Sequence, residues 1–168
     1  MEPIQLKFKD DGKTPNSSLP LLIYKNVFSE EKADADFIQQ HFESHNWKNA
    51  WQDTVYDFNH YHSNTHEVMG VYSGYATLQF GGEAGEQLTV EEGDAIIIPA
   101  GVGHMKLKAS DDFGVVGAYP DGKDYDIMKG NPDERPDADK NINAVPSPDE
   151  DPVYGKMEGL TALWKEKL

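Results

Sequence analysis

The chain contains HYHSNTHEVMGVYSG at residues 60–74 and GDAIIIPAGVGH at residues 93–104, two stretches that hold four of its six histidines. His60 and His62 alternate along an extended segment, which places both side chains on one face. Their Cα atoms are then roughly 6.5–7 Å apart. Both imidazoles can therefore reach one metal ion with bonds of ~2.0–2.1 Å. The pattern predicts a chelating histidine pair.

Two further side chains complete this candidate site. Glu67 follows His62 after a four-residue turn, so the next strand can return antiparallel with its carboxylate facing the same point. His104, after PAGVG, can supply another imidazole. Because the chain has no cysteine, nitrogen and oxygen atoms must hold any metal. We therefore expect His60, His62, Glu67 and His104 to be the ligands.

His66 has two open interpretations. Strand alternation points it away from the ion if Glu67 faces inward. It either substitutes for His60 as a ligand or donates a hydrogen bond to a ligand from outside, because ligating imidazoles usually need an outer partner. His41 and His45 are interpreted as helix residues only.

Short β-rich runs extend on both sides of these motifs and are separated by turns rich in Gly, Asp, Glu and Ser. Many short strands at regular spacing are typical of a sandwich or barrel. The runs are TVYDF (54–58), EVMGVY (67–72), ATLQF (76–80), AIIIP (95–99), MKLK (105–108) and FGVVGAY (113–119).

At this point the sequence resembles the cupin superfamily, which has two motifs. The first has two histidines one residue apart, a glutamate and a glycine, which correspond to His60, His62, Glu67 and Gly74. The second corresponds to Gly93, Pro99, Gly101 and His104, and it departs from the pattern only at Lys108, where cupins usually have asparagine. The resemblance implies an all-β cupin fold, a double-stranded β-helix or jelly-roll barrel, with the metal held by the four residues above.

A finer resemblance covers nearly the whole chain. The segments YHSNTHEVMGVYSG, FGGEAGE, IPAGVGHMKL, SDDFGVVGAYPDG and DPVYG are similar to those of the YjlB-like single-domain cupins. Most of these have no assigned activity, so the resemblance supports the fold and the metal and adds little about the substrate. It also implies that His60 is the least fixed of the four ligands.

The chain is expected to form a single domain with three parts. Residues 1–48 form an N-terminal arm and a helix, near residues 30–46 with Ser29 as its N-cap, packed on the barrel. Residues 49–120 form the cupin barrel core. Residues 121–168 form an acidic, Pro-rich strap and a short C-terminal helix. Residues 121–152 hold five of the ten prolines, and both a disordered linker and an ordered wrap remain open.

The composition limits the kinds of partner and the location that the protein can have. Thirty acidic against fifteen basic residues give a formal charge of −15 without a basic stripe, which argues against nucleic acid. No apolar run approaches the ~20 residues of a membrane span, and the opening residues lack the apolar core of a secretory signal. We expect a cytoplasmic protein. The alternation of Ile4, Leu6 and Phe8 indicates a spare strand, which favours a homodimer that covers sheet edges.

Three imidazoles and one carboxylate leave up to two open positions on an octahedral divalent transition metal, Mn, Fe, Co or Ni, with Zn or Cu as alternatives. The expected function is a small-molecule enzyme, a dioxygenase or an isomerase. A non-catalytic metal- or metabolite-binding module is the main alternative. Metal-free epimerisation by a histidine and tyrosine pair is the third.

Two groups of side chains are candidates for substrate contact. Lys106 and Lys108 share the alternating face of His104, so either can present an ammonium to a substrate carboxylate or extend to the rim. Tyr72 belongs to a set of aromatic residues that either line a pocket for a cyclic substrate or pack in the core. The set is Tyr72, Tyr75, Phe80, Phe113 and Tyr119.

Overall fold

The computed structural model describes residues 2–28 and 34–164. The strands are β1 (Ile4–Leu6), β2 (Leu21–Tyr24), β3 (Trp47–Asp53), β4 (Glu67–Ser73), β5 (Tyr75–Phe80), β6 (Glu86–Glu91), β7 (Ala95–Ile98), β8 (His104–Ala109) and β9 (Gly114–Pro120). The helices are α1 (Ala35–Ser44), the 3-10 turn η2 (Pro132–Glu134), α2 (Asp137–Ala144) and α3 (Leu160–Leu163). Within the described residues, no helix is both long and apolar enough to span a membrane.

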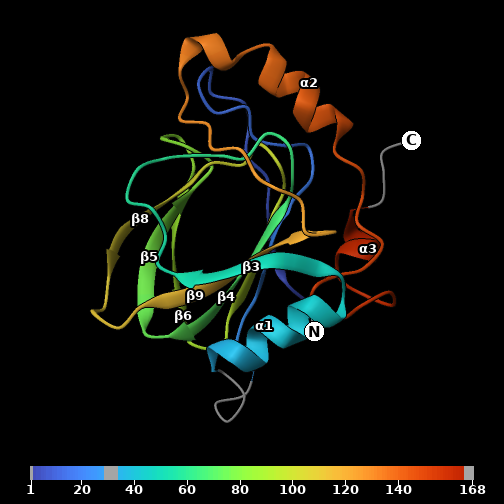
Figure 1. Ribbon diagram of the computed structural model, residues 1–168. Helices are drawn as coiled ribbons and strands as arrows, with labels where there is room; N and C mark the ends of the chain where they lie inside the picture. The colour runs from blue at the N-terminus through green and yellow to red at the C-terminus, as the bar shows by residue number, and fades with distance from the viewer. Residues whose placement is uncertain (1, 29–33, 165–168) are drawn as a thin grey trace.

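The strands form two antiparallel sheets that enclose one core (Figure 1). The larger sheet has the order β1-β2-β7-β4-β9-β3, and the smaller has β6-β5-β8. Alternate side chains from both sheets meet between them, including Met69 and Ile96 from the first and Leu78 and Phe80 from the second, all at most 1% exposed. The predicted all-β jelly-roll class is confirmed.

Helix α1 covers the outer face of the larger sheet. Its N-cap is Asp34, whose side chain accepts from the Phe37 N–H at 2.8 Å. Ile38 and Phe42 are fully buried against this sheet face. They lie so close that a Cβ atom at Gly70 of β4 would meet the Ile38 side chain at 2.7 Å. The expected N-cap, Ser29, lies outside the described residues, and the described helix begins at Ala35.

Two of the strand predictions differ from the structure. The run TVYDF at 54–58 is an irregular loop. The strand lies just before it and is β3, which pairs with β9 with one shift in register. β6 was not among the predicted strands. Both β3 and β6 are edge strands with largely polar, exposed residues, so hydrophobic alternation identifies them poorly.

The N-terminal arm belongs to the larger sheet rather than lying on it. β1 pairs with β2, and β2 pairs with β7 in the barrel. The expected boundary between residues 48 and 49 falls inside β3. The division into an arm and a barrel core therefore does not coincide with a break in the sheet.

The segment after β9 is an ordered wrap, which decides between the two interpretations of residues 121–152. It crosses one end of the barrel and carries α2 (Figure 1). Arg135 clamps it to the N-terminal loop through Asp10, with N–O distances of 2.8 and 2.5 Å. The chain then reaches α3, beside which the Trp164 indole N–H donates to the Pro20 carbonyl at 2.8 Å.

Candidate metal centre

The first two histidines lie on an extended segment beside β8. The backbones of His60 and His104 exchange two hydrogen bonds, at 3.2 and 2.9 Å. Between the two histidines, Tyr61 points the other way and donates its hydroxyl proton to Glu134 at 2.8 Å. His60 and His62 therefore face the interior together, as the alternation predicted.

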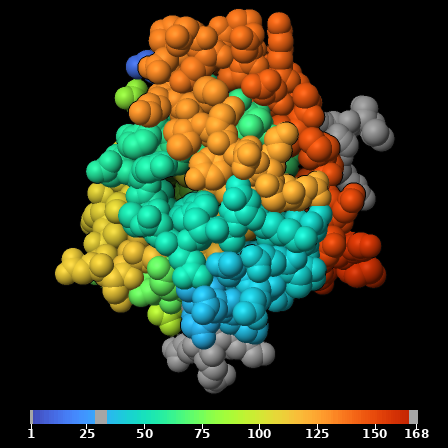
Figure 2. Space-filling model, viewed as in Figure 1, coloured from blue at the N-terminus to red at the C-terminus, as the bar shows by residue number. Residues whose placement is uncertain are grey.

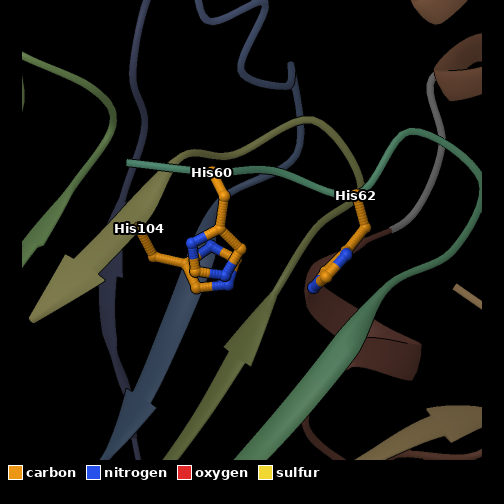
Figure 3. A group of neighbouring side chains, drawn as sticks. All are labelled: His60, His62 and His104. Carbon is orange, nitrogen blue, oxygen red and sulfur yellow. The ribbon is translucent and has the colours of Figure 1, made fainter. Parts of the chain in front are cut away.

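Three buried imidazoles converge at the end of the barrel interior (Figure 3). One ring nitrogen from each of His60, His62 and His104 lies within 4.8 Å of the other two. Such a group of nitrogen atoms can hold one metal ion. Residues distant in the sequence reach this point because β8 lies next to the His60–His62 segment.

A backbone carbonyl holds each imidazole in place. Nδ1 of His60 lies 3.1 Å from the Phe58 carbonyl, and Nδ1 of His104 lies 3.1 Å from the Val102 carbonyl. Nδ1 of His62 lies 2.5 Å from the Asp126 carbonyl in the strap. Because a carbonyl only accepts, each Nδ1 carries a hydrogen, which leaves Nε2 of each ring to hold either a second proton or a metal ion. This outer arrangement is typical of metal-ligating histidines.

Glu67, the first residue of β4, lies between two of these rings. Its Oε1 atom is 3.1 Å from Nε2 of His62 and 3.2 Å from Nε2 of His104. Its Oε2 atom accepts from the Tyr119 hydroxyl at 3.0 Å, and that oxygen accepts from the Trp51 indole N–H at 2.7 Å. The Tyr119 hydrogen bond fixes the carboxylate so that Oε1 faces the histidines.

The electrostatics favour an ionised carboxylate among the imidazoles. Burial raises the pKa of Glu67, but the charge of His62 and the hydrogen bonds from His104 and His62 outweigh it and lower the pKa overall. Burial, together with the charge of His104, lowers the pKa of His60 to about 3 and keeps that ring neutral. Burial opposes protonation of His62, yet its pKa is raised overall because Glu67 favours the charged ring.

This donor set fits a transition metal. With Nε2 atoms 3.1 and 3.2 Å from the carboxylate oxygen, each contact needs a positive centre between its two atoms, either a proton on the ring or a metal ion that replaces it. Imidazole nitrogen and carboxylate oxygen are suitable ligands for Mn, Fe, Co, Ni, Zn and Cu. The four residues thus provide both the donors and the negative charge that such an ion requires.

A cavity of about 200 Å³ adjoins the centre. A hollow on the molecular surface lies between the segment that follows β3 and the strap (Figure 2). Beside the four residues above, the cavity is lined by Trp51, Gln52, Asp53, Thr54, Val55, Tyr56, Met69, Tyr119 and Tyr125.

Comparison with known proteins agrees with this architecture. Residues 53–112 match the family model described as "Cupin domain". Over 158 residues, the chain is 44% identical to "Uncharacterized protein YjlB" of Bacillus subtilis (strain 168), and the alignment covers 94% of this chain and 93% of the relative. The chain belongs to the YjlB family of cupins.

The solved structures of other proteins are more distant from this YjlB-type chain. Acireductone dioxygenase from Bacillus anthracis is 16% identical (TM-score 0.42; 65% of this chain, 78% of that one). The WlaRB TDP-quinovose 3,4-ketoisomerase from Campylobacter jejuni is 17% identical (TM-score 0.42; 51% and 71%). Procruciferin from Brassica napus is 21% identical (TM-score 0.38), with 48% of this chain covering 20% of that one. This cupin thus spans about a fifth of the procruciferin length, and similarities this low carry no activity across.

His66 is buried but faces away from the three histidines of the cupin centre. Its Nδ1 accepts from the Ala100 N–H at 2.9 Å, and its ring lies 4.7 Å from that of Trp164, measured between centroids. Burial lowers its pKa to about 4. The structure therefore brings together the four expected ligands and leaves His66 outside this group.

The two candidate substrate contacts lie outside the cavity lining. Lys106 donates to the Thr54 hydroxyl at 2.9 Å, so its ammonium lies at the cavity rim. Tyr72 packs with the cluster between the larger sheet and α1. Because side chains alternate along β4, a residue five positions after Glu67 must point to the opposite face. Of the two interpretations of Tyr72, the structure shows packing rather than a place in the cavity lining.

Of the aromatic candidates, only Tyr119 lines the cavity. Phe80 and Phe113 pack in the core, and Tyr75 is 58% exposed. Sequence reasoning did not predict that Trp51 and Tyr125 line the cavity. Tyr125 stacks on Tyr119 with ring centroids 4.6 Å apart. Sequence reasoning also missed Asp126, which acts on His62 through its backbone carbonyl. A carbonyl contact of this kind leaves no signal in residue type.

Proposed function

We propose that this cupin binds one divalent transition metal through His60, His62, Glu67 and His104 and acts on a small molecule, as a dioxygenase or an isomerase. The observation that carries the proposal is the common orientation of the imidazoles. Each donates Nδ1–H to a backbone carbonyl, which directs the Nε2 atoms inward beside an ionised carboxylate. Mn, Fe, Co and Ni suit an octahedral site with open positions, and Zn or Cu can also occupy such a donor set.

When bound, the metal supplies Lewis-acid polarisation or, with iron, oxygen activation. The chain supplies the surroundings. Tyr119 holds Glu67 by its Oε2 atom, and Trp51 and Tyr125 form aromatic walls beside the ligands. The cavity volume of about 200 Å³ admits a small metabolite. The Lys106 ammonium at the rim can exchange its bond with Thr54 for a substrate carboxylate.

A non-catalytic metal- or metabolite-binding module is the second candidate. It is favoured by the largely aromatic and apolar groups next to the ligands, Trp51, Met69, Tyr119 and Tyr125. Metal-free epimerisation by a histidine and tyrosine pair has less support, because the Tyr119 hydroxyl proton is already donated to Glu67. A tyrosine that acts as an acid needs its proton directed at the substrate.

The open coordination positions are tested with cobalt. The Co(II)-loaded protein is titrated with acetohydroxamate, a bidentate oxygen ligand, while the visible absorption bands are followed. We expect a saturable change in the spectrum, and His62→Ala is the control without an intact site. An unchanged spectrum with cobalt bound would contradict open positions on the ion.

Turnover separates the enzyme from the binding module. Iron-loaded protein is supplied with enediols and catechols in an oxygen electrode, and sugar nucleotides are followed by NMR for isomerisation. Turnover that is lost in His62→Ala supports the enzyme. A stoichiometric metal without any turnover favours the binding module.

We also propose that the protein is a cytoplasmic homodimer. The support for assembly is the short edge strand β1, where Ile4 is 42% exposed. Light scattering at micromolar concentration should give twice the chain mass of 18.8 kDa. A monomer mass would contradict the dimer. The cytoplasmic location stays a prediction from the sequence.

A further inference from the structure

The two oxygens of the Glu67 carboxylate have different partners. Oε1 lies 3.1 Å from Nε2 of His62 and 3.2 Å from Nε2 of His104, so it faces the metal centre. Oε2 accepts from the Tyr119 hydroxyl at 3.0 Å. Among the described residues, Tyr119 is the one hydrogen-bond donor to Oε2. A single hydroxyl group therefore separates the roles of the two carboxylate oxygens.

The chemistry of its neighbours sets the direction of this hydrogen bond. The Trp51 indole N–H only donates, so the Tyr119 oxygen accepts there, at 2.7 Å. An ionised carboxylate only accepts, so the one hydroxyl proton of Tyr119 is donated to Glu67. The Tyr119 ring is itself fully buried, and it stacks on Tyr125 with ring centroids 4.6 Å apart. The hydroxyl is therefore held in place and directed at Oε2.

The number of donor atoms determines how many positions on a metal ion stay open. His60, His62, His104 and Oε1 of Glu67 supply four donors, whereas an octahedral ion has six positions. A carboxylate can also ligate through both of its oxygens. Glu67 would then supply a fifth donor, and the single remaining position would be too few for a molecule that binds through two oxygens.

We propose that Tyr119 is a positioning residue that restricts Glu67 to one ligating oxygen and thereby keeps two positions on the ion open for a bidentate small molecule. The proposal rests on the function proposed above and deepens it, because it assigns the choice of substrate to a residue that does not ligate. Tyr119 and Glu67 both line the cavity of about 200 Å³. A molecule in this cavity therefore meets the positions that the hydrogen bond controls.

The test compares two ligands of the Co(II)-loaded protein, followed by its visible absorption bands. Acetohydroxamate needs two positions on the ion, and azide needs one. In Tyr119→Phe, Oε2 is released and takes one of the open positions. We expect the affinity for acetohydroxamate to fall at least about tenfold and that for azide to change less than about threefold.

Tyr125→Phe is the matched control. It removes the same hydroxyl group from the neighbouring ring of the stack, which donates no hydrogen bond to Glu67 among the described contacts. It should bind both ligands as the unchanged protein does. Equal binding of acetohydroxamate by the cobalt-loaded Tyr119→Phe variant and the unchanged protein would overturn the proposal.

The affinity for cobalt separates positioning from mere support of the ligands. Loss of a residue that only supports a ligand typically costs ~10–100-fold in metal affinity. In Tyr119→Phe the second carboxylate oxygen offsets that loss, so cobalt affinity should change by less than ~10-fold. A loss of ~10–100-fold in cobalt affinity with unchanged acetohydroxamate affinity would assign Tyr119 a supporting role alone and overturn the proposal.

A second variant covers the case in which Tyr119→Phe does not fold. Trp51→Phe removes the indole N–H that fixes the Tyr119 oxygen. It should weaken acetohydroxamate relative to azide, by less than Tyr119→Phe does, and an unchanged ratio would overturn the proposal. The two proposals fail separately. An unchanged protein that holds no cobalt, or that binds cobalt but not acetohydroxamate, contradicts the proposed function. If it binds both and Tyr119→Phe binds both equally well, only the role of Tyr119 is lost.

Discussion

The His60–Glu67 segment and the strap residues that support it contribute to the same centre in different ways. The first supplies three of the four proposed ligands through side chains. The strap supplies the Asp126 carbonyl to His62, while the Asp126 carboxylate accepts from the backbone N–H and hydroxyl of Ser63. The identity of the ligands is thus encoded in residue type and spacing. The orientation of the His62 ring, in contrast, depends on the Asp126 carbonyl, about sixty residues away.

The largest effect is expected from removing a ligand side chain, either in the His60–Glu67 segment or, for His104, on β8. His62→Ala, Glu67→Ala and His104→Ala should each abolish tight metal binding, because too few protein donors remain and a buried polar partner is left unpaired at a cost of ~1–3 kcal/mol. Metal titrations on each variant measure this. Retention of tight stoichiometric binding in any one of them would remove that residue from the ligand set.

Acid should also empty the centre. Imidazoles bind metal only when neutral. The raised pKa of His62 means that protons compete with the metal there at a higher pH than at an ordinary histidine of pKa ~6.5, whereas His60, with a pKa of about 3, stays neutral. We expect occupancy to fall as the pH drops through ~6.5. Full occupancy maintained down to pH ~4 would indicate coordination by carboxylates alone.

A smaller effect distinguishes His60 from His66. His60→Ala should weaken metal binding less than the three variants above. His66→Ala should keep the stoichiometry and change affinity by at most ~10–100-fold, because His66 faces Ala100 rather than the centre. Metal titrations of the two variants under the same conditions show which of the two histidines is a ligand. If His66→Ala empties the site and His60→Ala does not, His66 is a ligand and the proposed set is wrong.

The smallest effect should come from the strap. Asp126→Ala removes the carboxylate bonds to Ser63 but keeps the carbonyl that accepts from His62, so metal affinity should fall by less than ~10-fold. Asp124→Ala, an exposed aspartate two residues earlier, is the matched control and should have no effect. A loss in Asp126→Ala as large as that in His62→Ala would mean that the strap, rather than the ligand segment, determines the centre.

The same contrast explains what could be predicted from the sequence. The histidine alternation and the second motif placed four residues that the structure brings together, because metal ligands require particular side chains at particular spacings. Tyr72 could have been excluded by counting from Glu67 along β4. The helix near residues 30–46 was predictable from spacing, since Ile38 and Phe42 pack on the sheet.

Other features depend on tertiary contacts. β3 is specified by its pairing with β9, and neither its polar side chains nor the β-branched and aromatic run after it indicated that. The strap is ordered by Arg135 and Asp126, whose partners Asp10 and Ser63 are remote in the sequence. Tyr125 reaches the cavity only because the strap is held in this way. Composition alone cannot identify such contacts.

The most direct test of the proposed metal centre is the metal content of the protein purified without a histidine tag. Mass spectrometry should find close to one transition-metal ion per chain, because three inward-facing imidazoles and Glu67 form one donor set. The absence of a stoichiometric metal, even after reconstitution with Mn, Fe, Co, Ni, Cu and Zn, would contradict it.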